Sequence, residues 1–132
     1  MKKENYIFFL IIVFACIIPT SCKKDTISYD FEGTVTGSLT NAPVSGVSVS
    51  ISQKILINGA TTDGHALAGS ATTNGSGYFD ISFDREMVTE FLIEFEKDNY
   101  FPLNILESSA NISTENINIF NENLEPQSWV TF

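Results

Sequence analysis

Apolar and polar residues alternate in two stretches of the chain, and this alternation is the strongest structural signal in the sequence. In 47–51 every second residue is Val or Ile and the residues between are serines; in 79–83 Phe and Ile alternate with Asp and Ser. A period of two is typical of a β-strand with one buried and one solvated face. Pro43 and Gly46 precede the first stretch, and a glycine-rich turn, 74–77, precedes the second. Both stretches therefore predict strands.

Further segments of the same kind predict an all-β protein. The predicted strands are 29–37, 47–57, 78–84, 90–96, a strand that begins at 100–103, 115–120 and 128–132, with a weak strand at 68–73. We expect a loop at 38–46, a long connection at 58–71 and one short helical turn at 84–89. No long amphipathic helix follows the leader. The spacing predicts an antiparallel β-sandwich of about seven strands, preceded by a helical signal peptide.

The first 21 residues have the three parts of an export signal. Lys2 and Lys3 form a basic start, 7–18 is an unbroken apolar run, and Thr20 and Ser21 are small and polar. Twelve apolar residues cover roughly 18 Å as a helix, whereas a membrane core is about 30 Å thick. We therefore predict a signal peptide at 1–21, a tether at 22–26 and one folded domain at 27–132.

The junction Pro-Thr-Ser-Cys at 19–22 resembles the lipobox of bacterial lipoproteins. The resemblance implies that Cys22 is acylated with palmitate-type chains and becomes the first residue of the mature protein. Such chains hold a protein on the membrane, here the bacterial outer membrane, on its periplasmic face or at the cell surface. Two alternatives stay open: lipidation of Cys16, and a simple cleaved signal with a spectator cysteine.

The tether carries two weaker resemblances. Lys23-Lys24-Asp25 is similar to the charged segments that follow the acylated cysteine in surface-exported lipoproteins of the Bacteroidetes group. Asp25-Thr26-Ile27 resembles the O-glycosylation site of the same group, which implies Thr26 as the acceptor.

The charge of the mature chain is strongly negative. Without Glu4, Lys2 and Lys3, the sequence has fifteen Asp and Glu against five Lys and Arg, a formal net charge of −10. Such a domain repels phosphate backbones, so nucleic acid is excluded as a partner. We interpret the charge as keeping an exported β-protein soluble rather than as an acidic binding face.

Two motifs resemble the carboxypeptidase regulatory-like domain, a member of the transthyretin-like (prealbumin-like) β-sandwich group. They are Pro-Val-Ser-Gly-Val-Ser-Val at 43–49 and Thr-Asn-Gly-Ser-Gly-Tyr-Phe at 73–79, with Gly-Thr-Val at 33–35 before them. The matches fall across 31–83, and 91–95 and 99–102 are similar to the next strand and turn of that family. The resemblance implies the fold but no specific activity, because this sandwich is an accessory module on many unrelated proteins.

The residues give little support for catalysis or metal binding. His65 is the single histidine, both cysteines lie at or before residue 22, and no serine stands in a Gly-x-Ser-x-Gly elbow. We therefore predict no enzymatic activity and no cofactor. Asp80, Asp84 and Glu86 are close in sequence, but Asp80 should face solvent on its strand, so no metal site is expected.

Two sets of surface residues are candidates for contacts with a ligand. Glu90, Glu94 and Glu96 share one side of a predicted strand, which we interpret as a solvated or edge-protecting face. Tyr78, Tyr100 and Trp129 are the aromatic candidates for stacking on sugars, although Trp129 also fits a core position.

These observations lead to one functional hypothesis and two alternatives. We expect a non-catalytic, lipid-anchored protein of the cell envelope that is a binding or scaffold module for a protein partner or glycan. The alternatives are an enzyme that acts on a small molecule or envelope glycan, which requires a pocket with His65 and a carboxylate, and a structural subunit that assembles through its strand edges.

Overall fold

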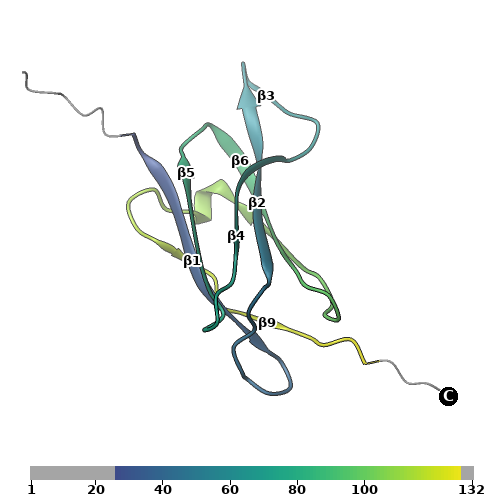
Figure 1. Cartoon of the computed structure of the whole chain (residues 1–132). Coiled ribbons are helices and arrows are strands. Elements are labelled where there is room, and N and C mark those ends of the chain that lie inside the picture. The colour runs from purple at the N-terminus through teal and green to yellow at the C-terminus, as the bar shows by residue number, and fades with distance from the viewer. Residues whose placement is uncertain (1–25, 129–132) are drawn as a thin grey trace, which may run out of the picture.

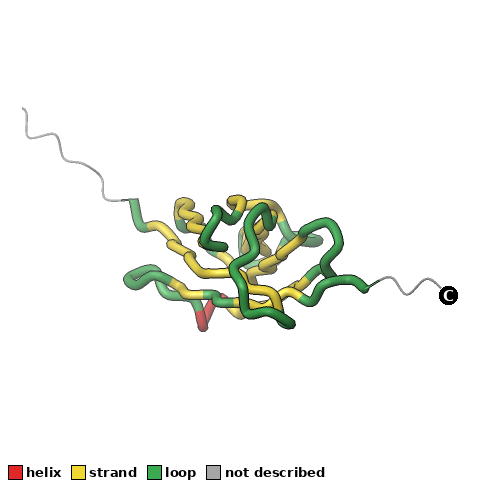
Figure 2. Tube along the Cα trace, turned by 60° about the horizontal axis from the view of Figure 1, so that its bottom comes forward, coloured by secondary structure: helices red, strands yellow, loops and turns green. Residues whose placement is uncertain are grey.

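The computed structural model describes residues 26–128 and contains two β-sheets packed face to face (Figures 1 and 2). The elements are β1 (Ser28–Gly37), β2 (Ser48–Ile57), β3 (Ala60–Thr61), β4 (Ala66–Thr72), β5 (Tyr78–Asp84), β6 (Val88–Glu96), β7 (Leu103–Ser108), a 3₁₀ helix η1 (Ser109–Asn111), β8 (Asn118–Ile119) and β9 (Glu122–Leu124). The predicted all-β sandwich is confirmed for this part of the chain. The predicted signal peptide, Cys22 and the strand predicted from residue 128 onward lie wholly or mainly outside it.

The two sheets differ in how their strands pair. In the first sheet β1 lies between β5, which is antiparallel to it, and the short strands β8 and β9, which are parallel to it. In the second sheet β2 pairs with β3 and β4 on one side and with β6 on the other, and β7 follows β6; all these pairs are antiparallel. All the longer strands are thus antiparallel, and only the short β8 and β9 add to β1 in parallel.

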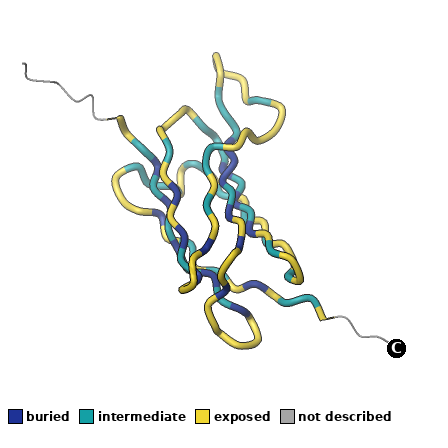
Figure 3. Tube along the Cα trace, in the orientation of Figure 1, coloured by how far each residue is buried: buried dark blue, intermediate teal, exposed yellow. Residues whose placement is uncertain are grey.

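The core lies between the sheets and is formed by the side chains that point inward, which occupy alternate positions along the long strands (Figure 3). Phe91, Ile93 and Phe95 of β6 have no exposed surface. Aromatic rings join the two sheets edge to face: the ring centroids of Phe31 and Phe91 are 5.7 Å apart, as are those of Phe79 and Phe95. Such pairs add about 0.5–1.5 kcal/mol each beyond the burial of their surface.

The two sequence motifs meet at one end of the sandwich through Thr73. Its buried hydroxyl donates to the carbonyl of Val44 at 2.7 Å and accepts from the amide of Val47 at 2.9 Å. The Thr73 amide also donates to the Val47 carbonyl, and the Gly46 amide donates to the Thr73 carbonyl. One threonine thus satisfies buried backbone groups of the loop that leads into β2, which explains why threonine is needed there.

Two glycines allow the backbone to approach closely around β1. A Cβ at Gly33 would lie 1.7 Å from the carbonyl oxygen of Phe120, in the segment that connects β8 and β9. Gly77 has φ +71°, and a Cβ there would lie 2.4 Å from the carbonyl oxygen of Val35. The Val35 amide donates to the Gly77 carbonyl at 2.8 Å, so the turn before β5 is fastened to β1.

The short helical turn predicted at 84–89 was wrong. Residue 84 ends β5, 88 and 89 begin β6, and the connection between them bonds outside itself: the Arg85 amide donates to the Ile27 carbonyl and the Met87 carbonyl accepts from the Leu56 amide. The expected connection at 58–71 contains β3, which was not predicted, and most of β4, which agrees with the weak strand predicted at 68–73; both pair with β2. Among residues 26–128 there is no helix long and apolar enough to cross a membrane.

Candidate ligand-binding site

A hollow of about 460 Å³ lies between the loop before β2 and the turn between β6 and β7. Both segments are at the end of the sandwich opposite the point where the chain enters β1 (Figure 1). We call this hollow the distal hollow. It is lined by Gly46, Ser48, Glu96, Lys97, Asp98, Tyr100 and Pro102. The loop before β2, the last residue of β6 and the turn between β6 and β7 all contribute. Its volume falls in the range of small-molecule sites, about 300–1,000 Å³.

The turn between β6 and β7 is held by backbone contacts that fix Tyr100 at the distal hollow. Asn99 has φ +66°, a conformation that asparagine tolerates better than most residues, and the Tyr100 amide donates to the Lys97 carbonyl at 3.1 Å. The segment after β9 pairs with this turn: the Phe101 amide donates to Glu125 and the Gln127 amide donates to Asn99. The site is thus built on a turn tied down on two sides.

A lysine closes one wall of the distal hollow. Lys97 Nζ donates to the carbonyl of Ser45 at 2.7 Å, which links the β6–β7 turn to the loop before β2. Gly46 has φ +72°, and a Cβ at this position would lie 3.1 Å from that nitrogen. The contact uses Lys97 internally, while Glu96 and Asp98 have no ion-pair or side-chain hydrogen-bond partner in the part of the chain that the structure describes.

The exposed groups at this end are suited to a polyhydroxylated ligand. Glu96 and Asp98 offer carboxylate oxygens that accept hydrogen bonds from hydroxyl groups. The half-buried Tyr100 supplies an aromatic ring, and the neighbouring Phe101 is 53% exposed. An aromatic face binds the apolar side of a sugar ring, and the carboxylates bind its rim.

A smaller hollow of about 230 Å³ lies on the outer face of β1 and β5, between Tyr78, Ser82 and the carboxylates of Asp30, Glu32 and Asp80. The Tyr78 hydroxyl donates to Glu32 at 3.0 Å, and Ser82 donates to Asp30. The bond to Glu32 raises the pKa of Tyr78 above its ordinary value, and desolvation adds to the shift. These polar groups largely satisfy one another, so this hollow is a weaker candidate for a ligand site.

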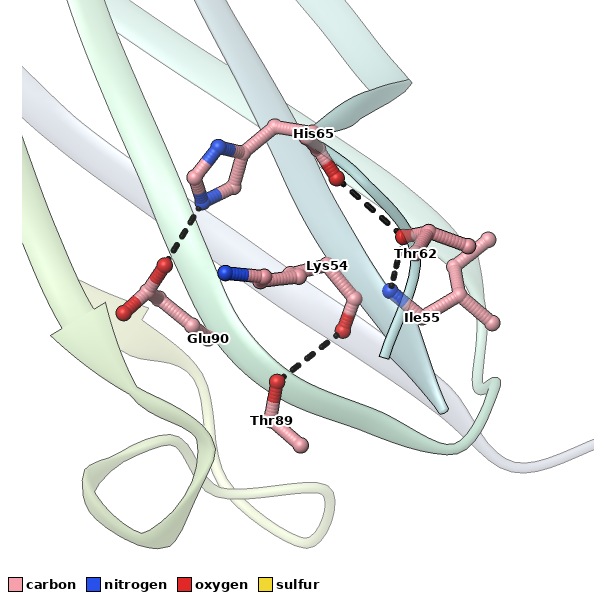
Figure 4. Close-up of polar contacts among 7 residues, drawn as sticks. Lys54, Ile55, Thr62, His65, Thr89 and Glu90 are labelled. Atoms are coloured by element: carbon pink, nitrogen blue, oxygen red, sulfur yellow. Dashed lines mark hydrogen bonds and ion pairs between the residues drawn. The ribbon is translucent and has the colours of Figure 1, made fainter. Parts of the chain in front are cut away.

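His65, predicted to lie alone on a loop, has a carboxylate partner (Figure 4). Its Nε2 lies 2.9 Å from Glu90 Oε1. His65 precedes β4 on one side of β2, and Glu90 is on β6 on the other side, paired with Lys54 of β2, so the contact passes over β2. The hairpin before His65 is also fastened: the Ile55 amide donates to Thr62 Oγ1, which donates to the Gly64 carbonyl. His65 lines neither the distal hollow nor the hollow on the outer face of β1 and β5.

The other predicted site residues are dispersed. Cys22 and Trp129 lie outside the residues that the structure describes, and Thr26 is exposed. Glu90 and Glu96 share one side of β6 with Glu94, as predicted, but Glu90 contacts His65 and Glu96 lines the distal hollow. Glu86 accepts from Gln53 Nε2 at 2.9 Å, away from the outer face of β5 that carries Asp80. Within 26–128 no three His, Cys, Asp or Glu side chains are placed to share a metal ion.

Comparison with known proteins shows the fold but no family. No family model matches the chain, and no curated protein is significantly similar to it. Among solved structures it resembles hydroxyquinol 1,2-dioxygenase of Pseudomonas putida DLL-E4 (TM-score 0.55, 10% identity, 80% of this chain and 58% of that one). It also resembles 3-chlorocatechol 1,2-dioxygenase of Rhodococcus opacus 1CP (TM-score 0.54, 12% identity, 79% of this chain and 62% of that one).

A pilin is among the weaker likenesses: the minor pilin GBS52 of Streptococcus agalactiae has a TM-score of 0.49 at 12% identity, with 81% of this chain and 48% of that one covered. The chain thus spans less than two thirds of each of these proteins. At 10–12% identity, the likeness to the dioxygenases shows a shared β-sandwich fold and nothing about chemistry.

Proposed function

We propose that this chain is a non-catalytic protein of the bacterial outer membrane, anchored by lipid at Cys22, that binds an envelope glycan in the distal hollow. The observation that carries the proposal is the position of the hollow. It lies at the opposite end of the sandwich from the chain's entry at residue 26 (Figure 1). A domain tethered at its N-terminus would hold this end away from the membrane.

The length of β1 sets the scale of that separation. β1 has ten residues and runs from the entry point to the distal end. At ~3.3 Å per residue it spans roughly 33 Å. A ligand bound beyond its far end would lie clear of the lipid surface, and the four charged or polar residues 23–26 would add further reach.

The chemistry of the distal hollow favours a glycan over an anionic ligand. Glu96 and Asp98 repel phosphate and carboxylate groups, and Lys97 is already bonded to the Ser45 carbonyl. Hydroxyl groups of a neutral sugar can donate to both carboxylates while Tyr100 or Phe101 covers an apolar ring face.

We also assign the domain to the carboxypeptidase regulatory-like, transthyretin-like group. Support comes from the motif residues themselves, which contact one another across the fold. Thr73 bonds to Val44 and Val47, and Gly77 bonds to Val35. Each motif therefore has a structural role, which is consistent with an accessory module whose function resides in its loops.

An enzyme is the second candidate, and the contact between His65 and Glu90 is the observation that favours it. A histidine oriented by a carboxylate is the usual arrangement of a general base. Against this, the pair lies on the outer face of the second sheet, outside the distal hollow and the hollow on β1 and β5. We assign the pair to fastening the β3–β4 hairpin; hydrolysis of envelope glycans that is lost in His65→Ala would establish the enzyme instead.

Calorimetric titration of the protein with a panel of neutral oligosaccharides tests the proposal. We expect binding by at least one of chitotriose, mannotriose and maltotriose, weakened about tenfold by combined Glu96→Gln and Asp98→Asn substitutions, because each lost charged hydrogen bond costs on the order of 1 kcal/mol. Glu94→Gln, on the same side of β6, is the matched control. Equal binding by the double variant and the control would refute the site.

A further inference from the structure

One flank of the sandwich is open. A hollow of about 390 Å³, which we call the flank hollow, lies between the end of β7 and the segment around β8. It is lined by Glu107, Asn111, Ile112, Asn118, Ile119 and Phe120. Of these, Ile112 and Phe120 pack against the core and are only partly buried, as are Leu103 and Ile105 on the bordering strand β7. The core is therefore incompletely covered between β7 and β8.

The opposite flank is closed, which shows that the opening is not a general property of the sandwich. There β4 of the second sheet packs against β5 of the first. A Cβ at Gly69 of β4 would lie 2.6 Å from Ile81 Cγ2 and 3.1 Å from Phe83 Cδ1, so the two strands are in direct contact. On the other flank, by contrast, Glu107 of β7 and Ile119 of β8 both line the flank hollow.

The strand that borders the opening has a free edge. Over 26–128, β6 is the only ladder partner of β7, so alternate amide and carbonyl groups of β7 point away from the sheet. Natural edge strands are usually protected by lysine, proline, a bulge or an inward-pointing charge. Leu103–Ser108 has only the last of these, Glu107, and its Leu106 is 59% exposed. Across the opening Ile119 of β8 is 63% exposed.

The charge at the opening is negative. Glu107 lines the flank hollow, and its carboxylate accepts a hydrogen bond from the amide Nδ2 of Asn111 at 3.0 Å, which leaves the negative charge itself unpaired by a cation in 26–128. The three Lys and Arg residues of 26–128 are Lys54, Arg85 and Lys97. None of them lines the hollow. A second copy of this chain would place Glu107 and a large negative net charge against the same charges, so it fits poorly.

We infer that the free edge of β7 is a docking site for an extended, basic segment of a protein partner, which adds to the second sheet as a further strand. Its backbone pairs with β7, its apolar side chains cover Ile105 and Phe120, and a lysine or arginine meets Glu107. This site is separate from the distal hollow. The result for glycan binding therefore does not decide whether a partner binds at β7.

A capped eight-residue peptide is the probe, measured by fluorescence anisotropy with the full chain in a zwitterionic detergent. Ile105 and Glu107 share the inward face of β7, so the odd positions of the peptide are valine or isoleucine except for one lysine that can face Glu107, and its even positions are lysine. Two control peptides carry backbone N-methyl groups, one on every odd position and one on every even position. Pairing with β7 uses the amides of one set, so one control must bind at least about tenfold more weakly than the unmodified peptide at equal charge.

A matched pair of variants locates the site. Leu106 and Leu67 lie in one row across the outer face of the second sheet, joined through Leu92 and Ser52, but on opposite edges. Leu106→Lys should weaken peptide binding about tenfold and Leu67→Lys by less than about twofold. In the unmodified protein, the peptide should slow amide exchange in β7 and leave β4 unchanged.

Three results would overturn the inference. They are equal binding of both N-methylated peptides and the parent, equal binding by the Leu106→Lys and Leu67→Lys proteins, and protection of β4 rather than β7. Self-association of the chain that Leu106→Lys abolishes would also overturn it, because the occupant would then be a second copy. If the Leu106→Lys protein does not fold, amide exchange in the unmodified protein shows whether the peptide protects β7 or β4.

Discussion

At the scale of single residues, the hydroxyl of Thr73 fastens the loop before β2 by two hydrogen bonds, and its neighbour Thr72 takes no part in this. Thr73 is 4% exposed and bonds to both Val44 and Val47, whereas Thr72 is exposed at the end of β4. The loop it holds also carries Gly46 and Ser45, which form one wall of the distal hollow. Thr73 therefore supports both the fold and the candidate site.

We predict that Thr73→Val lowers the free energy of unfolding by about 2–4 kcal/mol, because it leaves a buried amide and a buried carbonyl short of a partner. Thr73→Ser keeps the hydroxyl and should cost about 1 kcal/mol or less, and Thr72→Val should be nearly neutral. Urea unfolding of the three proteins measures this. A Thr73→Val protein as stable as Thr72→Val would show that the two bonds contribute nothing.

Residue patterns in the sequence indicated Thr73 and Gly77 as motif positions but could not predict their contacts. Thr73 bonds to Val44 and Val47, more than 25 residues away in the sequence. Residue 33 must be glycine because the carbonyl of Phe120, 87 residues away, leaves no room for a Cβ. The pairing of His65 with Glu90 was missed for the same reason. Glu90 is 25 residues from His65 in the sequence and lies on β6.

At the scale of elements, alternation predicted the long strands well and the short ones poorly. β1, β2, β5 and β6 each bury one face against the core, so a period of two is visible in their residues. β8 and β9 have two and three residues and are held by parallel pairing with β1. So few residues carry no readable period, and their order along β1 is set by tertiary contacts.

β9 also contains a residue whose charge opposes folding. Burial raises the pKa of the Glu122 carboxyl above its ordinary value of 4.5. The folded state therefore binds this proton more tightly than the unfolded state does. The stability from this group is fully present below pH 4.5 and is lost as the pH rises through the raised native pKa.

We predict that Glu122→Gln raises the free energy of unfolding at neutral pH, because the amide has no charge to desolvate. The difference from the unmodified protein should disappear by about pH 3.5, where the carboxyl is protonated in both states. Glu125→Gln, at an exposed position after β9, is the control. Urea unfolding at both pH values measures the effect; a Glu122→Gln protein less stable than the unmodified one at neutral pH would show that the charge is favourably paired.

At the scale of the whole molecule, the sandwich has three surfaces with different character. The end opposite the chain's entry carries the distal hollow, one flank is closed by β4 against β5, and the other is open beside β7. The sequence predicted the two-sheet fold from alternation. It could not predict the hollows, because each is formed by residues from two or three separate segments that the fold brings together.

The proposed function depends on the lipid anchor at Cys22, because only an anchored N-terminus makes the far end of the sandwich a surface that faces away from the membrane. Metabolic labelling with an alkyne analogue of palmitate, followed by isolation of the protein, measures the tether directly. We expect label on the unmodified protein and on Cys16→Ser, and none on Cys22→Ser. An unmodified protein without label, or a Cys22→Ser protein that still carries it, would contradict the account.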